Sequence, residues 1–137
     1  MPRKSPFGVV RIEKNVYIPI PSGTSAVEWV TDWTPGYGFT IESVKGYITT
    51  AGAGAGATRV IQVLKGASTV VATVTLLLAN ATPTGKEIVF TVTPANATFL
   101  DTDVLTVDSI AAGAVSFTAG AFNLAIVYRQ NPQRVSL

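Results

Sequence analysis

The sequence predicts a single all-β domain: an eight-stranded antiparallel β-sandwich, of the jelly-roll type, with a flexible N-terminal arm. Three observations predict it. The chain has 137 residues, a length that suits one domain. From Val9 onward, valine, isoleucine, threonine and aromatic residues dominate, and these residues favour strands. Turn-forming residues recur at the short intervals that are typical of sandwiches and barrels.

Strand-breaking residues divide the chain into eight expected strands. These are residues 9–20, 26–34, 39–50, 58–64, 69–78, 86–93, 104–110 and 121–129. Prolines end the first, second and sixth strands, and glycine-rich residues 51–57 predict a loop after the third. In the third strand, alternation predicts a shared face for Phe39, Ile41, Ser43, Lys45 and Tyr47. Eight short strands at hairpin spacing are the number found in a jelly roll.

The fifth strand and the chain ends need separate arguments. The leucines of residues 69–78 would also fit a helix, but the valines and threonines favour a strand. This strand is either buried on both faces, or has one face in the core and the other in an interface. Residues 1–8 hold two prolines, a glycine and two cations, which predicts a flexible arm. The sandwich then spans residues 9–129, and residues 130–137 form a C-terminal tail.

The composition argues against catalysis and against a bound cofactor or metal. The chain has no cysteine and no histidine, so thiolate metal sites and the commonest general base are absent. Glu13, Glu28 and Glu42 fall on three different expected strands, and nothing pairs them as a glycosidase requires. We therefore expect a non-enzymatic protein.

The charge content is low and its distribution is uneven. Charged residues make up 13% of the chain, against roughly 25% in ordinary soluble domains, and the mean hydropathy is +0.40. Such a chain is either an alanine- and threonine-rich monomer or a subunit whose faces are buried in an assembly. A net charge of +2 is too small to indicate a nucleic-acid partner. Uncharged residues 66–85 and 109–128 contain turn residues, so we expect strands there and no membrane partner.

Two clusters have alternative interpretations. Asp101, Asp103 and Asp108 could hold Ca²⁺ in a loop, but the simpler interpretation is that Asp101 and Asp103 cap a turn. Trp29 and Trp33 share strand parity and lie near Tyr37. These aromatic residues pack in the core, form an interface hot spot or provide a stacking surface for sugar rings.

Four stretches resemble the small jelly-roll domains of tailed-bacteriophage virions. Residues 39–48 resemble their opening strand, and residues 60–70 resemble the following Val-x-Val-x-Lys-x-Gly hairpin. Residues 99–108 are similar to their Phe-x-x-Gly-Asp-x-Leu-x-Val strand, with Thr102 in place of the glycine. Residues 124–128 are similar to their closing strand. The resemblance covers roughly residues 37–128 and leaves both chain ends outside it.

The resemblance implies a head decoration or cement protein, which binds the major capsid protein on the virion surface and is often a homotrimer. A second possibility is a receptor- or carbohydrate-binding module of a tail fibre or spike, and a third is a connector or tail-tube subunit. The basic chain ends and the tryptophans are the predicted partner contacts. They are Arg3, Lys4, Arg11, Lys14, Trp29, Trp33, Arg129 and Arg134.

Overall fold

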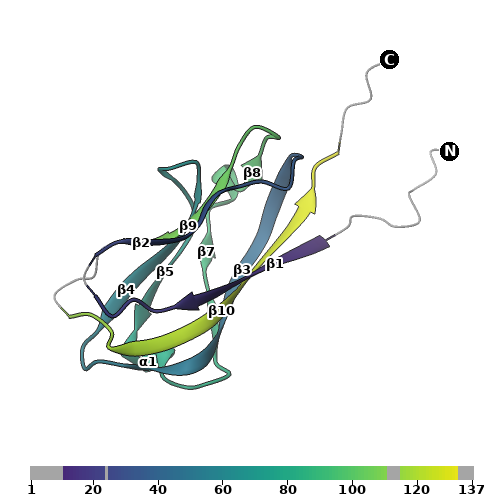
Figure 1. Ribbon diagram of the computed structural model, residues 1–137. Helices are drawn as coiled ribbons and strands as arrows, with labels where there is room; N and C mark the ends of the chain where they lie inside the picture. Colours follow the sequence, from purple (N-terminus) through teal and green to yellow (C-terminus); the bar gives the residue numbers. More distant parts are fainter. Residues whose placement is uncertain (1–10, 24, 111–114, 133–137) are drawn as a thin grey trace, which may run out of the picture.

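Two antiparallel sheets face each other across one apolar core in the computed structural model, which describes residues 11–23, 25–110 and 115–132 (Figure 1). Sheet A contains β1 (Arg11–Pro19), β10 (Ala119–Gln130), β3 (Phe39–Ala53), β6 (Glu87–Val89) and β8 (Thr98–Phe99). Sheet B contains β2 (Val27–Trp33), β9 (Leu105–Ser109), β4 (Thr58–Lys65), β5 (Thr69–Leu77) and β7 (Thr91–Val92). The expected all-β sandwich is therefore confirmed.

The strand order is that of a jelly roll. Sheet A has the order β1-β10-β3-β6, with β8 also pairing with β3, and sheet B has the order β2-β9-β4-β5-β7. The outermost strands in the sequence pair with each other, as β1 does with β10 and β2 does with β9. The innermost strands, β4 and β5, form a hairpin. This nesting is what results when one long hairpin is wound into two sheets, which gives the jelly-roll topology.

The described residues form ten strands where eight were expected. The expected strand 86–93 divides, because β6 pairs with β3 in sheet A while β7 pairs with β5 in sheet B. Phe90 lies between them and is 3% exposed, so the chain crosses from one sheet to the other over a side chain inserted into the core. The second additional strand is β8, which forms only two pairs with β3.

Two expected boundaries are also wrong. The loop expected at residues 51–57 is shorter, because β3 continues to Ala53, which pairs with Ala119 of β10. The expected strand 69–78 ends at Leu77, where the short helix α1 (Leu78–Ala81) begins. The amide of Leu77 donates to Asn80 Oδ1 over 2.8 Å, so the side chain of the third helical residue closes the first turn.

None of the helices among the described residues has the length and hydropathy needed to cross a membrane.

A β-bulge in β3 changes which of its residues face the core. Ser43 pairs with Val127 and Ile41 pairs with Tyr128, so Glu42 is an extra residue opposite the β10 ladder. Beyond the bulge the alternation is inverted. Val44 and Ile48 are buried, whereas Tyr47 is 41% exposed. The single face expected for all five alternate residues is therefore wrong beyond Ile41.

Candidate functional site

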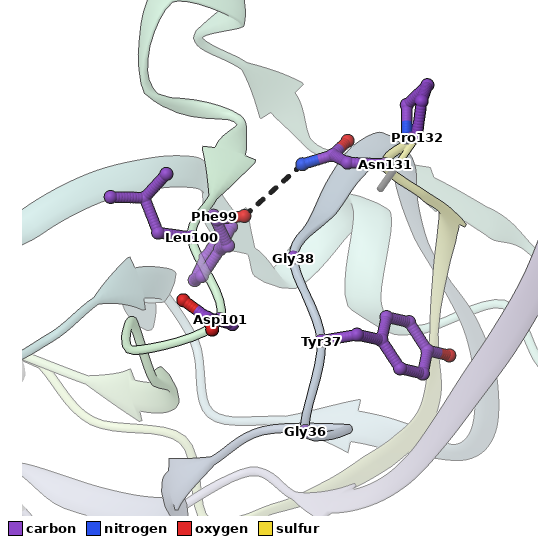
Figure 2. Close-up of a pocket in the computed structure, with 8 residues that line it drawn as sticks. All are labelled: Gly36, Tyr37, Gly38, Phe99, Leu100, Asp101, Asn131 and Pro132. Atoms are coloured by element: carbon purple, nitrogen blue, oxygen red, sulfur yellow. Dashed lines mark hydrogen bonds between the residues drawn. The ribbon is translucent and has the colours of Figure 1, made fainter. Parts of the chain in front are cut away.

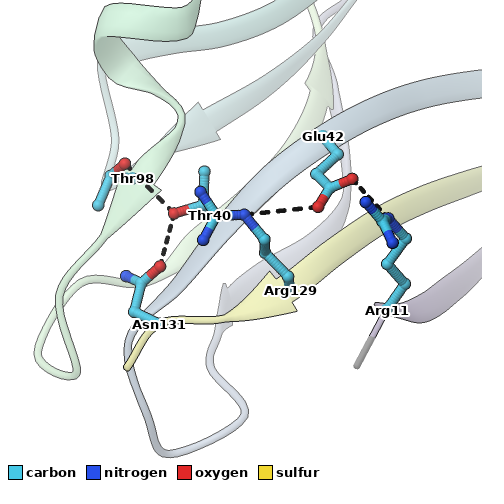
Figure 3. A network of polar contacts seen from close by, with 6 residues as sticks. All are labelled: Arg11, Thr40, Glu42, Thr98, Arg129 and Asn131. Carbon is cyan, nitrogen blue, oxygen red and sulfur yellow. Dashed lines mark hydrogen bonds and ion pairs between the residues drawn. The ribbon is translucent and has the colours of Figure 1, made fainter. Parts of the chain in front are cut away.

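Glu42 joins two of the predicted basic contacts at one end of sheet A (Figure 3). Arg11 of β1 donates from Nε to Glu42 Oε2 over 2.8 Å, and Arg129 Nε lies 3.4 Å from Glu42 Oε1. The β-bulge brings Glu42 to this position between the two flanking strands. Exposed ion pairs of this kind stabilise a fold by less than about 1 kcal/mol each. Sequence reasoning identified both arginines but not the glutamate that brings them together.

The same end of the molecule has an open pocket with a volume of about 490 Å³ (Figure 2). Asn131 closes one side of it, because its Nδ2 donates to the Phe99 carbonyl over 3.3 Å and its Oδ1 accepts from Thr40 Oγ1 over 2.6 Å. The lining offers one carboxylate and no pair of side chains suited to acid–base chemistry. It consists of Gly36, Tyr37, Gly38, Phe99, Leu100, Asp101, Asn131 and Pro132.

Lys14 and Trp33 meet where the two sheets leave an open side between β1 and β2. Lys14 Nζ lies 4.3 Å from the centroid of the Trp33 ring, and burial lowers the pKa of this lysine. The Trp33 ring in turn contacts Phe39 and Tyr128 edge-on, with centroids 5.8 Å away in both cases. Both predicted contacts are thus engaged in covering the core, and a direct role in partner binding stays a prediction.

The remaining predicted aromatic residues also contribute to the core. Trp29 and Tyr37 are partly buried against the core cluster. Burial, followed by the hydrogen bond and the charge interaction with Tyr37, raises the pKa of Tyr128 to about 12. This environment favours the core interpretation of the Trp29, Trp33 and Tyr37 group over the stacking surface.

The three late aspartates are not brought together around one point. Asp103 Oδ2 accepts from the Leu100 amide over 2.8 Å, which confirms it as a turn cap. Asp108 lies on β9 opposite Gln62 and Glu28, and its buried Oδ1 has no hydrogen-bond partner. Burial and then the charge of Glu28 raise the pKa of Asp108. Within the described ranges, no three metal-ligating side chains form a cluster.

Several sheet edges formed by described residues carry features that hinder the addition of another strand. Lys14 is an inward-pointing charge on edge strand β1, and Asp32 adopts a positive φ of 51° that interrupts edge strand β2. At the opposite side, β6, β7 and β8 have three residues or fewer. Such features are how natural sheets avoid pairing edge to edge.

The outer faces of the two sheets differ in charge. Residues paired directly across antiparallel strands share a face, so the register assigns each side chain. The outer face of sheet A carries three cations and three anions, which are Arg11, Glu13, Glu42, Lys45, Glu87 and Arg129. On the outer face of sheet B, Asp108 of β9 lies opposite Gln62 and Glu28, whereas β4 and β5 carry no charge there. The β4 and β5 residues on that side are Val60, Gln62, Leu64, Val70, Thr73 and Thr75; of these, Leu64 is only 3% exposed and Thr75 is the most exposed.

The two charged residues of β4 and β5 point away from that outer face. Arg59 is 1% exposed and donates from Nε to Ser109 Oγ over 3.0 Å. Lys65 Nζ lies 5.4 Å from the centroid of the Phe99 ring, which belongs to sheet A. The outer face of β4 and β5 is therefore uncharged because both cations are turned inward.

Comparison with known proteins shows one distant similarity in fold. No protein-family model matches the chain, and comparison with curated proteins gives no match. A solved structure described as "Bacillus endospore appendages form a novel family of disulfide-linked pili" is 20% identical. The match covers 90% of this chain and 91% of that chain, with a TM-score of 0.49. A similarity this distant gives no information about function.

Proposed function

We propose that the protein is a non-enzymatic structural subunit that binds a larger protein assembly through the outer face of sheet B. The observation that carries this proposal is the uncharged outer surface of β4 and β5. Burying the β4 and β5 part of this face costs little, because its only charged neighbours among the described residues, Asp108 and Glu28, lie on β9 and β2. The valine and threonine side chains on it are suited to close packing against another protein.

The resemblance to phage head decoration proteins suggests the partner. On this proposal, the chain binds the major capsid protein on the virion surface and acts as a homotrimer. The outer face of β4 and β5 covers roughly 250 Å², given strands about 26 Å long and about 4.8 Å apart. A standard interface needs about 800 Å² from each partner. Several linked copies would compensate for a small contact through multivalency.

The chain ends supply a second part of the proposal. Arg3, Lys4 and Arg134 lie outside the described residues, as does the whole of the expected arm. Their proposed role is to contact acidic surfaces of neighbouring subunits. Arg11 and Lys14 belong to β1, so a test of the arm should remove residues 1–10 and leave β1 intact. The truncated chain should fold but occupy fewer sites on its particle.

A lysine placed on sheet B tests the central claim. Thr75 is exposed on β5 opposite Val60, so Thr75→Lys introduces a charge at the proposed interface without disturbing the core. We expect cosedimentation with purified phage heads to weaken by at least tenfold. Asn15→Lys is the matched control, because Asn15 is also exposed, on the outer face of sheet A. Equal binding by the two variants would contradict the assignment of this face.

A further inference from the structure

A row of aromatic and amide side chains crosses three strands on the outer face of sheet A. Tyr17 of β1 pairs with Asn123 of β10, and Asn123 pairs with Tyr47 of β3. All three side chains therefore point to the same side. Tyr17 is 59% exposed and Tyr47 is 41% exposed. Because adjacent strands are about 4.8 Å apart, the backbones that carry the two rings are roughly 9.6 Å apart, with the shorter amide side chain between them.

Short side chains and one compensated charge pair border this row, and Glu87 of β6, which pairs with Tyr47, continues it on the same face. In the next row along the strands, Ala125 lies between Asn15 and Lys45, and its short side chain does not extend beyond the tyrosines. Lys45 Nζ lies 3.6 Å from Glu87 Oε1, so these two charges compensate each other beside Tyr47. The arginine pair around Glu42 lies at the far end of the strands.

We propose that Tyr17, Asn123 and Tyr47, here called the tyrosine platform, bind a neutral glycan. The flat faces of two sugar rings stack on the two phenol rings, as apolar C–H surfaces do on aromatic rings. The Asn123 amide, which can both donate and accept hydrogen bonds, is placed to bind hydroxyls of the sugar units between them. This binding activity is distinct from the assembly role of sheet B and uses the opposite face of the sandwich.

The charge pattern favours a glycan over other ligands. A phosphate-bearing ligand needs unpaired cations, but Lys45 beside the platform is already neutralised by Glu87. A protein large enough to cover sheet A would also bury the paired charges around Glu42, and removing ions from water is costly. A single glycan chain contacts the tyrosine row and leaves those charges hydrated.

Binding of the full chain to an array of immobilised neutral oligosaccharides, built from glucose, mannose or N-acetylglucosamine, tests the proposal. We expect at least one oligosaccharide to bind, and Tyr17→Ala and Tyr47→Ala each to lower its affinity about tenfold. Tyr17→Phe and Tyr47→Phe should retain most of the affinity, because the stacking ring remains. Leu100→Ala is the matched control, since Leu100 is 63% exposed at a site away from the platform.

The outcomes separate this proposal from the assembly role. The alanine variants should still cosediment with phage heads, and Thr75→Lys should still bind the oligosaccharide. Absence of binding to every oligosaccharide, or binding that the alanine variants leave unchanged, would overturn the platform. Self-association that depends on concentration and is lost in Tyr17→Ala would also overturn it, because a second copy would then occupy this face.

Discussion

Replacing Arg59 by methionine would measure what a buried cation without a carboxylate partner contributes to this fold. Arg59 donates from Nη1 to the Gly23 carbonyl over 2.9 Å, from Nη2 to the Ser25 carbonyl, and from Nε to Ser109. No carboxylate among the described residues forms an ion pair with it, and burial lowers its pKa. The guanidinium thus ties the connection between β1 and β2 to sheet B through neutral acceptors alone.

The expected loss of stability follows from these three hydrogen bonds. A hydrogen bond to a charged group contributes about 1.5–3 kcal/mol, so the three together contribute about 4.5–9 kcal/mol. Removing a guanidinium from water costs several kcal/mol, which offsets part of that gain. Methionine has a similar length and restores apolar contacts. We therefore expect Arg59→Met to lower the free energy of unfolding by about 2–4 kcal/mol.

Urea unfolding followed by tryptophan fluorescence would measure this change, because both tryptophans lie on β2, next to the tethered connection. With a denaturant slope of about 2 kcal/mol/M, the midpoint should fall by about 1–2 M while the slope stays constant. Arg11→Met is the control and should change the free energy by less than about 1 kcal/mol, since that arginine forms an exposed ion pair. A midpoint for Arg59→Met at or above that of the parent chain would refute the reasoning. It would mean that desolvation of the cation outweighs its three hydrogen bonds.

Two further substitutions test the packing and the electrostatics of the sheets. Asp108→Asn should raise stability at neutral pH by less than about 1 kcal/mol, because solvent screens this partly exposed carboxylate. In the folded chain the pKa of Asp108 is raised above 3.8. The parent chain therefore loses stability as the pH rises through this folded pKa, whereas the asparagine variant, which has no carboxylate there, does not. Thermal unfolding across pH would show the gain disappear below pH 3.8, and a gain that persists there would contradict this cause. Gly46→Ala should lower the free energy of unfolding by about 1–3 kcal/mol, because the added Cβ would lie 2.7 Å from Phe122 Cδ2 in the core. Urea unfolding would measure it, and an unchanged midpoint would show that the Phe122 ring can move aside.

Much of the fold could be predicted from local patterns. Seven of the eight expected strands correspond to β1, β2, β3, β4, β5, β9 and β10, because turn residues and β-branched residues act over a few positions. The division of residues 86–93 between two sheets could not be predicted. A buried Phe90 looks the same in the sequence whether the strand continues or crosses the core.

The candidate surfaces depended more strongly on the tertiary structure. The two tryptophans close together in the sequence allowed an exposed aromatic surface as one interpretation. In the structure, Trp33 packs against Phe39 and Tyr128, and the exposed aromatic residues are Tyr17 and Tyr47. Simple alternation placed Tyr47 with Phe39, and only the bulge at Glu42 turns it outward. The prediction that basic residues contact a partner also did not anticipate that Glu42 pairs with Arg11 and Arg129.

The sequence by itself determined that the chain forms strands with one apolar side, and that cysteine and histidine chemistry is absent. Only the tertiary structure decided which residues meet on one surface. Tyr17 and Tyr47 are thirty positions apart and are brought together through Asn123, which lies more than seventy positions beyond both. The physical reason is that strand formation depends on neighbouring residues, whereas register depends on pairing between distant strands and shifts with a single bulge.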